Sequence, residues 1–140
     1  MQSVKKENLI FMRLLPEEDV NRQLINVCKK YKISTAVIIS AIGQIKKVKL
    51  GFFKKPGNYS PKLISRPLEI LSLSGLINKE DNDYNLHLHI IVGDENKKAL
   101  GGHFIEGLIS ITAEIVLLIS DVNIKRKKNN KTGLKDLVIE

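Results

Sequence analysis

The chain is poor in cysteine and aromatic residues, and it contains no tryptophan. Its single cysteine, Cys28, excludes an intrachain disulfide and a zinc site built on several thiolates, which fits a reducing compartment. No apolar run approaches the roughly 20 residues that span a bilayer. The first residues, Met1–Asn8, do not resemble a signal peptide. These absences predict a cytoplasmic protein without a membrane partner.

The length and composition are those of an ordinary globular protein. The 140 residues suit one domain, 1–140, and the hydrophobic fraction of 43% can supply a core of Ile, Leu and Val. The formal net charge of +8 allows contact with nucleic acid or another anionic partner. The same charge is equally consistent with a lysine-rich proteome.

One segment has helical periodicity. We predict a helix over 16–31, with Pro16 at its first position and Glu17, Glu18 and Asp19 in its first turn. Cationic lysines crowd its last turn, where the helix dipole favours them. The apolar stripe that would cover a sheet consists of Val20, Leu24, Val27, Cys28 and Tyr31.

The remaining apolar segments predict strands joined by short polar turns. Gly43 is expected to break the first of them, and Pro56-Gly57-Asn58 marks a turn. Such a pattern predicts an α+β fold, a mainly antiparallel sheet with one principal packed helix. The expected strands are Thr35–Ile42, Val48–Phe52, Leu68–Ile77, Tyr84–Val92, Ile109–Ile119 and Leu134–Ile139.

All three histidines of the chain fall within 17 residues. His87 and His89 are two apart on a predicted strand, so their side chains share one face. A hairpin through Gly93 would bring His103 beside them, and Gly101 and Gly102 would let the backbone approach closely. Three neutral imidazoles can hold a metal at about 2.0–2.1 Å and leave a fourth position open. Zinc is the favoured ion, although copper, iron and nickel also accept imidazole.

Spacing alone leaves two interpretations of these histidines open. They are a three-histidine metal site, or they are ordinary strand residues that form hydrogen bonds to their neighbours. The H-x-H pattern is weak by itself, and its continuation into G-G-H after a turn makes it more specific.

Several segments together resemble the PPC (plants and prokaryotes conserved) domain, which stands alone in bacteria and archaea and accompanies AT-hooks in plant proteins. The resemblance covers residues of about 10–138. It is carried by Arg13-Leu14, Glu18-Asp19-Val20, Ser40-Ala41-Ile42-Gly43, Leu68-Glu69-Ile70-Leu71-Ser72-Leu73-Ser74-Gly75, Leu86-His87-Leu88-His89, Gly101-Gly102-His103 and Thr112-Ala113-Glu114-Ile115.

The resemblance implies an antiparallel sheet with flanking helix, a homotrimer, and a metal-binding unit at His87, His89 and His103. Two departures are visible. Glu17 stands where relatives often have Gly, and the AT-hook is missing, since Ser65-Arg66-Pro67 lacks its core. The label of DNA-binding protein that accompanies the family therefore rests on association here.

Two further features have a functional and an ordinary interpretation. Glu114 lies between apolar residues, so we expect a buried carboxylate. It could orient a metal-bound histidine, act as a general base beside bound water, or be a structural carboxylate bonded to the backbone or to a lysine. The basic stretch Lys125–Lys131 could contact phosphates, but it has no interleaved aromatic residues and such runs are usually solvated. Cys28, on the apolar stripe, is expected to be buried and inert.

The sequence thus favours a trimeric metal-binding protein with a binding or regulatory role. One alternative is a DNA-binding protein that contacts phosphates through its basic surface. Another is a metal-dependent enzyme acting on a small molecule, distantly like acetolactate decarboxylase, with Glu106, Glu114 or a neighbouring subunit supplying acid or base. A purely structural trimeric scaffold is the fourth interpretation. No catalytic or nucleic-acid-binding residue can be assigned from the sequence.

Overall fold

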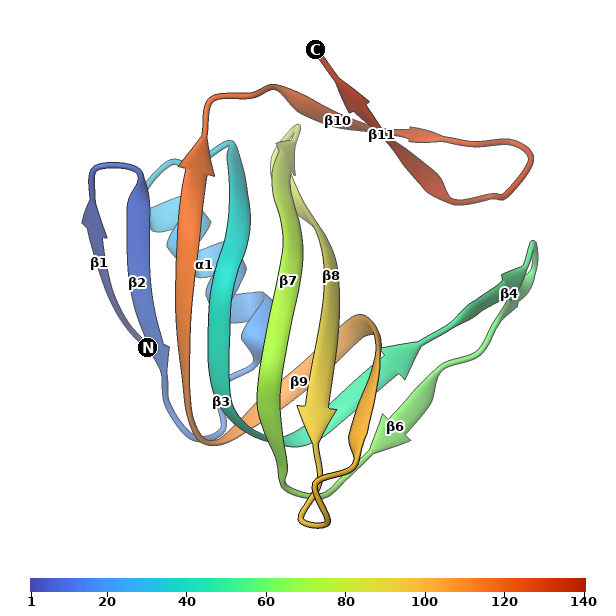
Figure 1. Cartoon of the computed structure of the whole chain (residues 1–140). Coiled ribbons are helices and arrows are strands. Elements are labelled where there is room, and N and C mark those ends of the chain that lie inside the picture. The colour runs from blue at the N-terminus through green and yellow to red at the C-terminus, as the bar shows by residue number, and fades with distance from the viewer.

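The computed structural model describes residues 1–140, and strands dominate it (Figure 1). The only helix, α1, has 11 residues, and no helix has the length and apolar character needed to cross a membrane. The elements are β1 (Gln2–Lys6), β2 (Leu9–Leu14), α1 (Val20–Lys30), β3 (Thr35–Gly51), β4 (Phe53–Lys55), β5 (Asn58–Tyr59), β6 (Lys62–Ile64), β7 (Leu68–Glu80), β8 (Asp83–Gly93), β9 (Ala99–Ser120), β10 (Ile124–Lys128) and β11 (Lys135–Ile139).

The main sheet is antiparallel throughout and bends back on itself. Its strand order is β1-β2-β9-β8-β7-β3-β6, and β9 also pairs with β3. The pairings β9–β8, β8–β7, β7–β3 and β3–β9 therefore close a ring of four strands. This closure encloses an aliphatic core that includes Ile45, Ile77, Leu88 and Ile109. The predicted fold class, a mainly antiparallel sheet with one packed helix, is confirmed.

Helix α1 lies behind the sheet in Figure 1 and buries Val20, Leu24, Val27 and Cys28 against the core. It is shorter than predicted, because Asp19 is the N-cap and its side chain accepts a hydrogen bond from Arg22 N at 2.8 Å. The prediction that Pro16 and the acidic residues form the first turn is wrong. Glu17 has φ 68°, a region that favours glycine, so its departure from the family pattern falls where glycine would be relaxed.

Gly43 does not break its strand, as the sequence had led us to expect. It lies inside the 17-residue β3 with φ 140°, at a register shift in the pairing with β9. A Cβ at this position would come within 2.2 Å of the Thr112 carbonyl oxygen. The glycine therefore lets two long strands cross closely at a bulge, and the chain continues as one strand.

The last two strands form a separate hairpin beside the end of β7 (Figure 1). Ile124 is buried, and its carbonyl accepts a hydrogen bond from the fully buried Asn78 at 3.3 Å. Thr35 Oγ1 donates to the Val122 carbonyl at 2.9 Å. These contacts hold the β10–β11 hairpin over the same side of the molecule that carries the histidines.

Candidate metal centre

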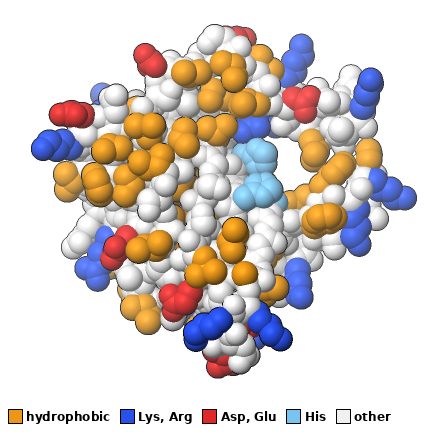
Figure 2. Space-filling view, in the orientation of Figure 1, with side chains coloured by type: hydrophobic (Ala, Val, Ile, Leu, Met, Phe, Trp, Pro, Cys, Tyr) orange, Lys and Arg blue, Asp and Glu red, His pale blue; other side chains and the backbone are white.

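The histidines lie on the wall of a hollow of about 890 Å³ (Figure 2). The main sheet supplies one side of this hollow, the segment around β4 and β5 another, and the β10–β11 hairpin a third. Its lining residues are Gly51, Phe52, Phe53, Tyr59, Asn85, Leu86, His87, His89, Gly101, Gly102, His103, Ile105, Arg126, Leu134 and Lys135.

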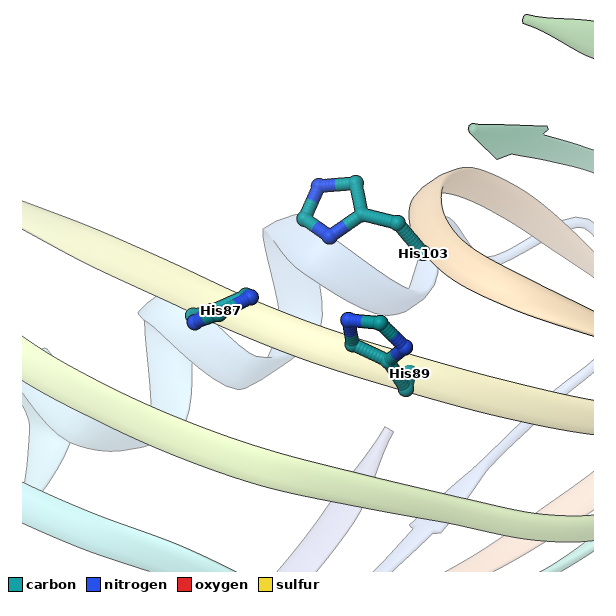
Figure 3. Close-up of side chains that lie close together, drawn as sticks. All are labelled: His87, His89 and His103. Carbon is teal, nitrogen blue, oxygen red and sulfur yellow. The ribbon is translucent and has the colours of Figure 1, made fainter. Parts of the chain in front are cut away.

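Two strands bring the three imidazoles together, as Figure 3 shows. His87 and His89 extend from the same face of β8, with Leu88 between them buried on the opposite face. His103 of β9 is the register partner of His89, and it also pairs with Gly51 of β3. The third ring thus stands where β9 leaves β8 and joins β3.

Glycines make this junction compact. A Cβ on Gly101 would lie 2.9 Å from the Ile90 carbonyl oxygen, and one on Gly102 would lie 3.1 Å from that of Gly51. A larger residue at either position would push β9 away from its neighbours. The close backbone approach expected at Gly101-Gly102 is therefore present.

The arrangement of the rings fits a shared metal ion. Each pair of ring centroids is 5.4 Å apart, and one nitrogen from each ring lies within 4.8 Å of those of the other two. Bonds of about 2.1 Å would put each centroid about 3.2 Å from the ion, and tetrahedral angles would then separate the centroids by about 5.2 Å. Modest ring rotations would bring the nitrogens to the spacing of about 3.4 Å that a tetrahedral site needs.

The electrostatic environment favours the neutral form of two rings. Burial, followed by the positive charge of Arg126 and the interaction with His89, lowers the pKa of His87. Burial and the two neighbouring histidines lower the pKa of His103. Only neutral imidazole can bind a metal, so these shifts help the cluster to act as a ligand set near neutral pH.

Several lining residues were not foreseen from the sequence. The Tyr59 ring meets the His103 ring edge-on with centroids 6.1 Å apart, and burial raises the pKa of Tyr59. Arg126 and Lys135 come from the β10–β11 hairpin. The basic stretch is visible in the sequence, but no local pattern indicates that Arg126 faces the histidines. The hairpin is placed by contacts between segments far apart in the chain.

Other predicted residues lie elsewhere. Glu114 is exposed rather than buried, and it lines a different hollow together with Phe11 and Ile42. Within one chain it therefore does not orient a histidine. Glu106 is exposed, and it is the register partner of Lys49 in the pairing of β9 with β3. Its neighbour Ile105 faces the hollow. Cys28 is buried as predicted, and burial raises its thiol pKa to about 12.

Comparison with known proteins supports the family resemblance. The sequence model of the Plants and Prokaryotes Conserved domain matches residues 1–121. This domain is abbreviated both PCC and PPC. The chain belongs to this family. A curated relative, the Bifunctional protein GlmU of a Synechococcus strain, is 34% identical over 131 residues, which are 92% of this chain. The chain spans only 20% of the length of that relative.

Solved structures share the whole PPC fold. A protein of Bacteroides thetaiotaomicron, provisionally designated DNA-binding, is 28% identical with a TM-score of 0.90 over 98% of this chain and 96% of its own. A metal-containing protein of Archaeoglobus fulgidus is 28% identical with a TM-score of 0.83, over 96% and 95%. A plant- and prokaryote-conserved protein of Pyrococcus horikoshii is 26% identical with a TM-score of 0.81, over 96% and 93%.

Proposed function

We propose that this PPC-domain protein binds one divalent metal ion, with zinc as the favoured ion, through His87, His89 and His103. The observation that carries the proposal is the convergence of three imidazoles with equal centroid separations of 5.4 Å on the wall of an open hollow. A fourth coordination position would face that hollow and remain available to a ligand. The archaeal neighbour described as metal-containing is consistent with this assignment.

The hollow's composition favours binding over catalysis within one chain. Its lining includes no aspartate or glutamate, so no carboxylate stands beside the open position to move a proton. A hydrolytic or decarboxylating reaction that relies on a carboxylate as general acid or base would need that group from a second subunit. We therefore propose a binding or regulatory role for the metal and its ligand.

The decisive experiment is elemental analysis of natively purified protein by mass spectrometry. We expect one metal ion per chain in the wild type and none in His87→Ala/His89→Ala. The matched control is Ile91→Ala, because Ile91 occupies the same face of β8 two residues beyond His89 and is 48% exposed. Equal metal content in the wild type and the double variant would overturn the proposal.

We also propose that the chain assembles as a homotrimer. The sheet face turned away from α1 exposes apolar side chains, including Phe11 at 54% and Ile42 at 53%, and Figure 2 shows hydrophobic groups gathered on this face. An exposed apolar area on a folded protein is typical of an association surface.

Binding to DNA is the second candidate, and the hairpin supports it. Lys125, Lys127 and Lys128 are exposed on β10, in a chain of net charge +8. Phosphate contacts of this kind release counterions, so the affinity for duplex DNA should fall steeply as salt rises from about 50 to 200 mM. Affinity that is independent of salt would contradict this candidate.

A further inference from the structure

Two cations and no carboxylate line the hollow that the histidines face. Lys135 is partly neutralised, since its Nζ lies 3.4 Å from Glu80 Oε2. Arg126 forms no ion pair in the chain, and its buried Nη2 atom has no hydrogen-bond partner. An enclosed guanidinium nitrogen without an acceptor is unusual, because leaving a charged donor unsatisfied costs more than a neutral one.

The fold holds Arg126 in this position. Ile124, two residues earlier on the same face of β10, is buried and tied to Asn78 through its carbonyl. Lys125 and Lys127 point the other way and are exposed. The buried Ile124 side chain thus docks the hairpin, and Arg126, two residues later on the same face of β10, points into the hollow.

The carboxylate whose charge acts on Arg126, that of Glu80, is already engaged by other donors. Glu80 accepts hydrogen bonds from Asn85 Nδ2 and from Lys135 Nζ. These bonds, chiefly the one from Asn85, together with the charge of Arg126, lower the pKa of Glu80. Arg126 influences Glu80 through space without pairing with it, so an acceptor for the guanidinium has to come from outside the chain.

Apolar and aromatic side chains line much of the rest of the wall. Phe52, Phe53, Leu86, Ile105 and Leu134 line the hollow, and a volume of about 890 Å³ lies within the range of small-molecule sites. An inorganic anion would leave most of this surface in contact with water. An organic acid would place its carboxylate at the cation and its apolar body against the wall.

We infer that Arg126 and this wall form a binding site for a small organic carboxylate next to the three-histidine centre. The guanidinium fork matches a carboxylate in a bidentate manner. The inference deepens the proposed function, because a metal at the histidines would offer its open position to the same anionic group. The match to the family's sequence model covers residues 1–121, so Arg126 lies outside the matched range.

The test is isothermal titration of purified full-length protein, with metal content measured on the same samples. The probes are phenylacetate, 3-phenylpropionate and 4-methylpentanoate, each compared with its neutral amide. We expect at least one acid to bind about 10-fold or more tightly than its amide, and Arg126→Gln to remove this preference. Arg126→Gln should keep the metal, and Lys127→Gln, the same charge change on the outer face of β10, should bind like the wild type.

The outcomes separate the two proposals. If the wild type contains no metal but binds an acid in a way that depends on Arg126, the metal proposal is overturned and the carboxylate site is upheld. A metal-loaded wild type that binds none of the acids, or binds each acid no better than its amide, would overturn the carboxylate site alone. Arg126→Gln and Arg126→Lys that both bind the acids like the wild type would overturn it as well.

Discussion

At the scale of single residues, the lowered pKa values of His87 and His103 make the stability of the folded chain depend on pH. Burial lowers both values below the ordinary value, so the folded protein resists protonation of these rings. The unfolded chain binds protons more readily than the folded one as the pH falls below about 6.5. Acid therefore opposes the folded state, and it would also oppose binding of the metal that we propose.

We predict that the metal-free protein loses thermal stability as the pH falls from 7.5 to 5.0, and that His103→Gln loses less over the same range. The difference isolates the histidine, since the carboxylates titrate in both proteins. Scanning calorimetry of the two metal-free proteins at matched ionic strength provides the measurement. Parallel pH profiles would contradict the prediction.

A glycine outside the hollow also constrains the backbone that carries His87. Gly75 of β7 has φ 142°, and a Cβ there would meet the His87 carbonyl oxygen at 2.1 Å. Substitution strains the local backbone and forces β8 to shift where it carries His87.

Gly75→Ala is expected to lower the free energy of unfolding by about 2–4 kcal/mol and to weaken metal affinity together with it. Chemical denaturation and competition with a chromophoric chelator would measure the two effects. Ser72→Ala, an exposed residue of β7 that pairs with Ile91 rather than with a histidine, is the control and should change neither. Unchanged affinity in folded Gly75→Ala would show that the histidines tolerate movement of β8.

At the scale of the elements, the sequence was informative where a pattern is local. The alternation in Tyr84–Val92 gave the shared face of His87 and His89 correctly, and the stripe of α1 identified its buried side. Boundaries failed where side chains decide them. Asp19 is the N-cap of α1, whereas the pattern placed it inside a first turn that began at Pro16. Gly43 accommodates a bulge where the end of a strand was predicted.

The long-range features of the site were beyond such patterns. The pairing of His89 with His103 depends on register, and the placement of Arg126 depends on contacts of the hairpin with Thr35 and Asn78. The hairpin contacts with Thr35 and Asn78 join segments more than 40 residues apart, and no local periodicity encodes them. This is why three histidines could be nominated from the sequence while the opposite wall of their hollow could not.

The docking of the β10–β11 hairpin depends on Asn78, which is fully buried. We predict that Asn78→Ala loosens the hairpin, because the mutation removes the amide that holds the Ile124 carbonyl, at a cost of about 1–3 kcal/mol. Hydrogen exchange followed by mass spectrometry should show faster exchange in peptides from 122–140 and little change in β8. The exposed turn variant Asn82→Ala should exchange like the wild type. Equal protection of the hairpin in Asn78→Ala would mean that other contacts hold it.

At the scale of the whole molecule, the apolar sheet face and the histidine cluster are formed by different strands, so each can be altered without the other. The face involves Phe11 of β2 and Ile42 of β3, whereas all three histidines come from β8 and β9 of one chain. A site completed within one chain should survive loss of the oligomer. A site that needs a partner's ligand should not.

We therefore predict that Phe11→Asp/Ile42→Asp sediments as a monomer, while the wild type sediments as a trimer, in analytical ultracentrifugation. Two charges on the face would each have to be desolvated on association, at a cost that such an interface cannot offset. Ile139→Asp, which alters a 67% exposed isoleucine on β11, should remain trimeric. If the monomeric variant keeps one metal per chain, the site belongs to the single chain. If the metal is lost together with the oligomer, a neighbouring subunit completes the coordination, and the open position would then lie between subunits.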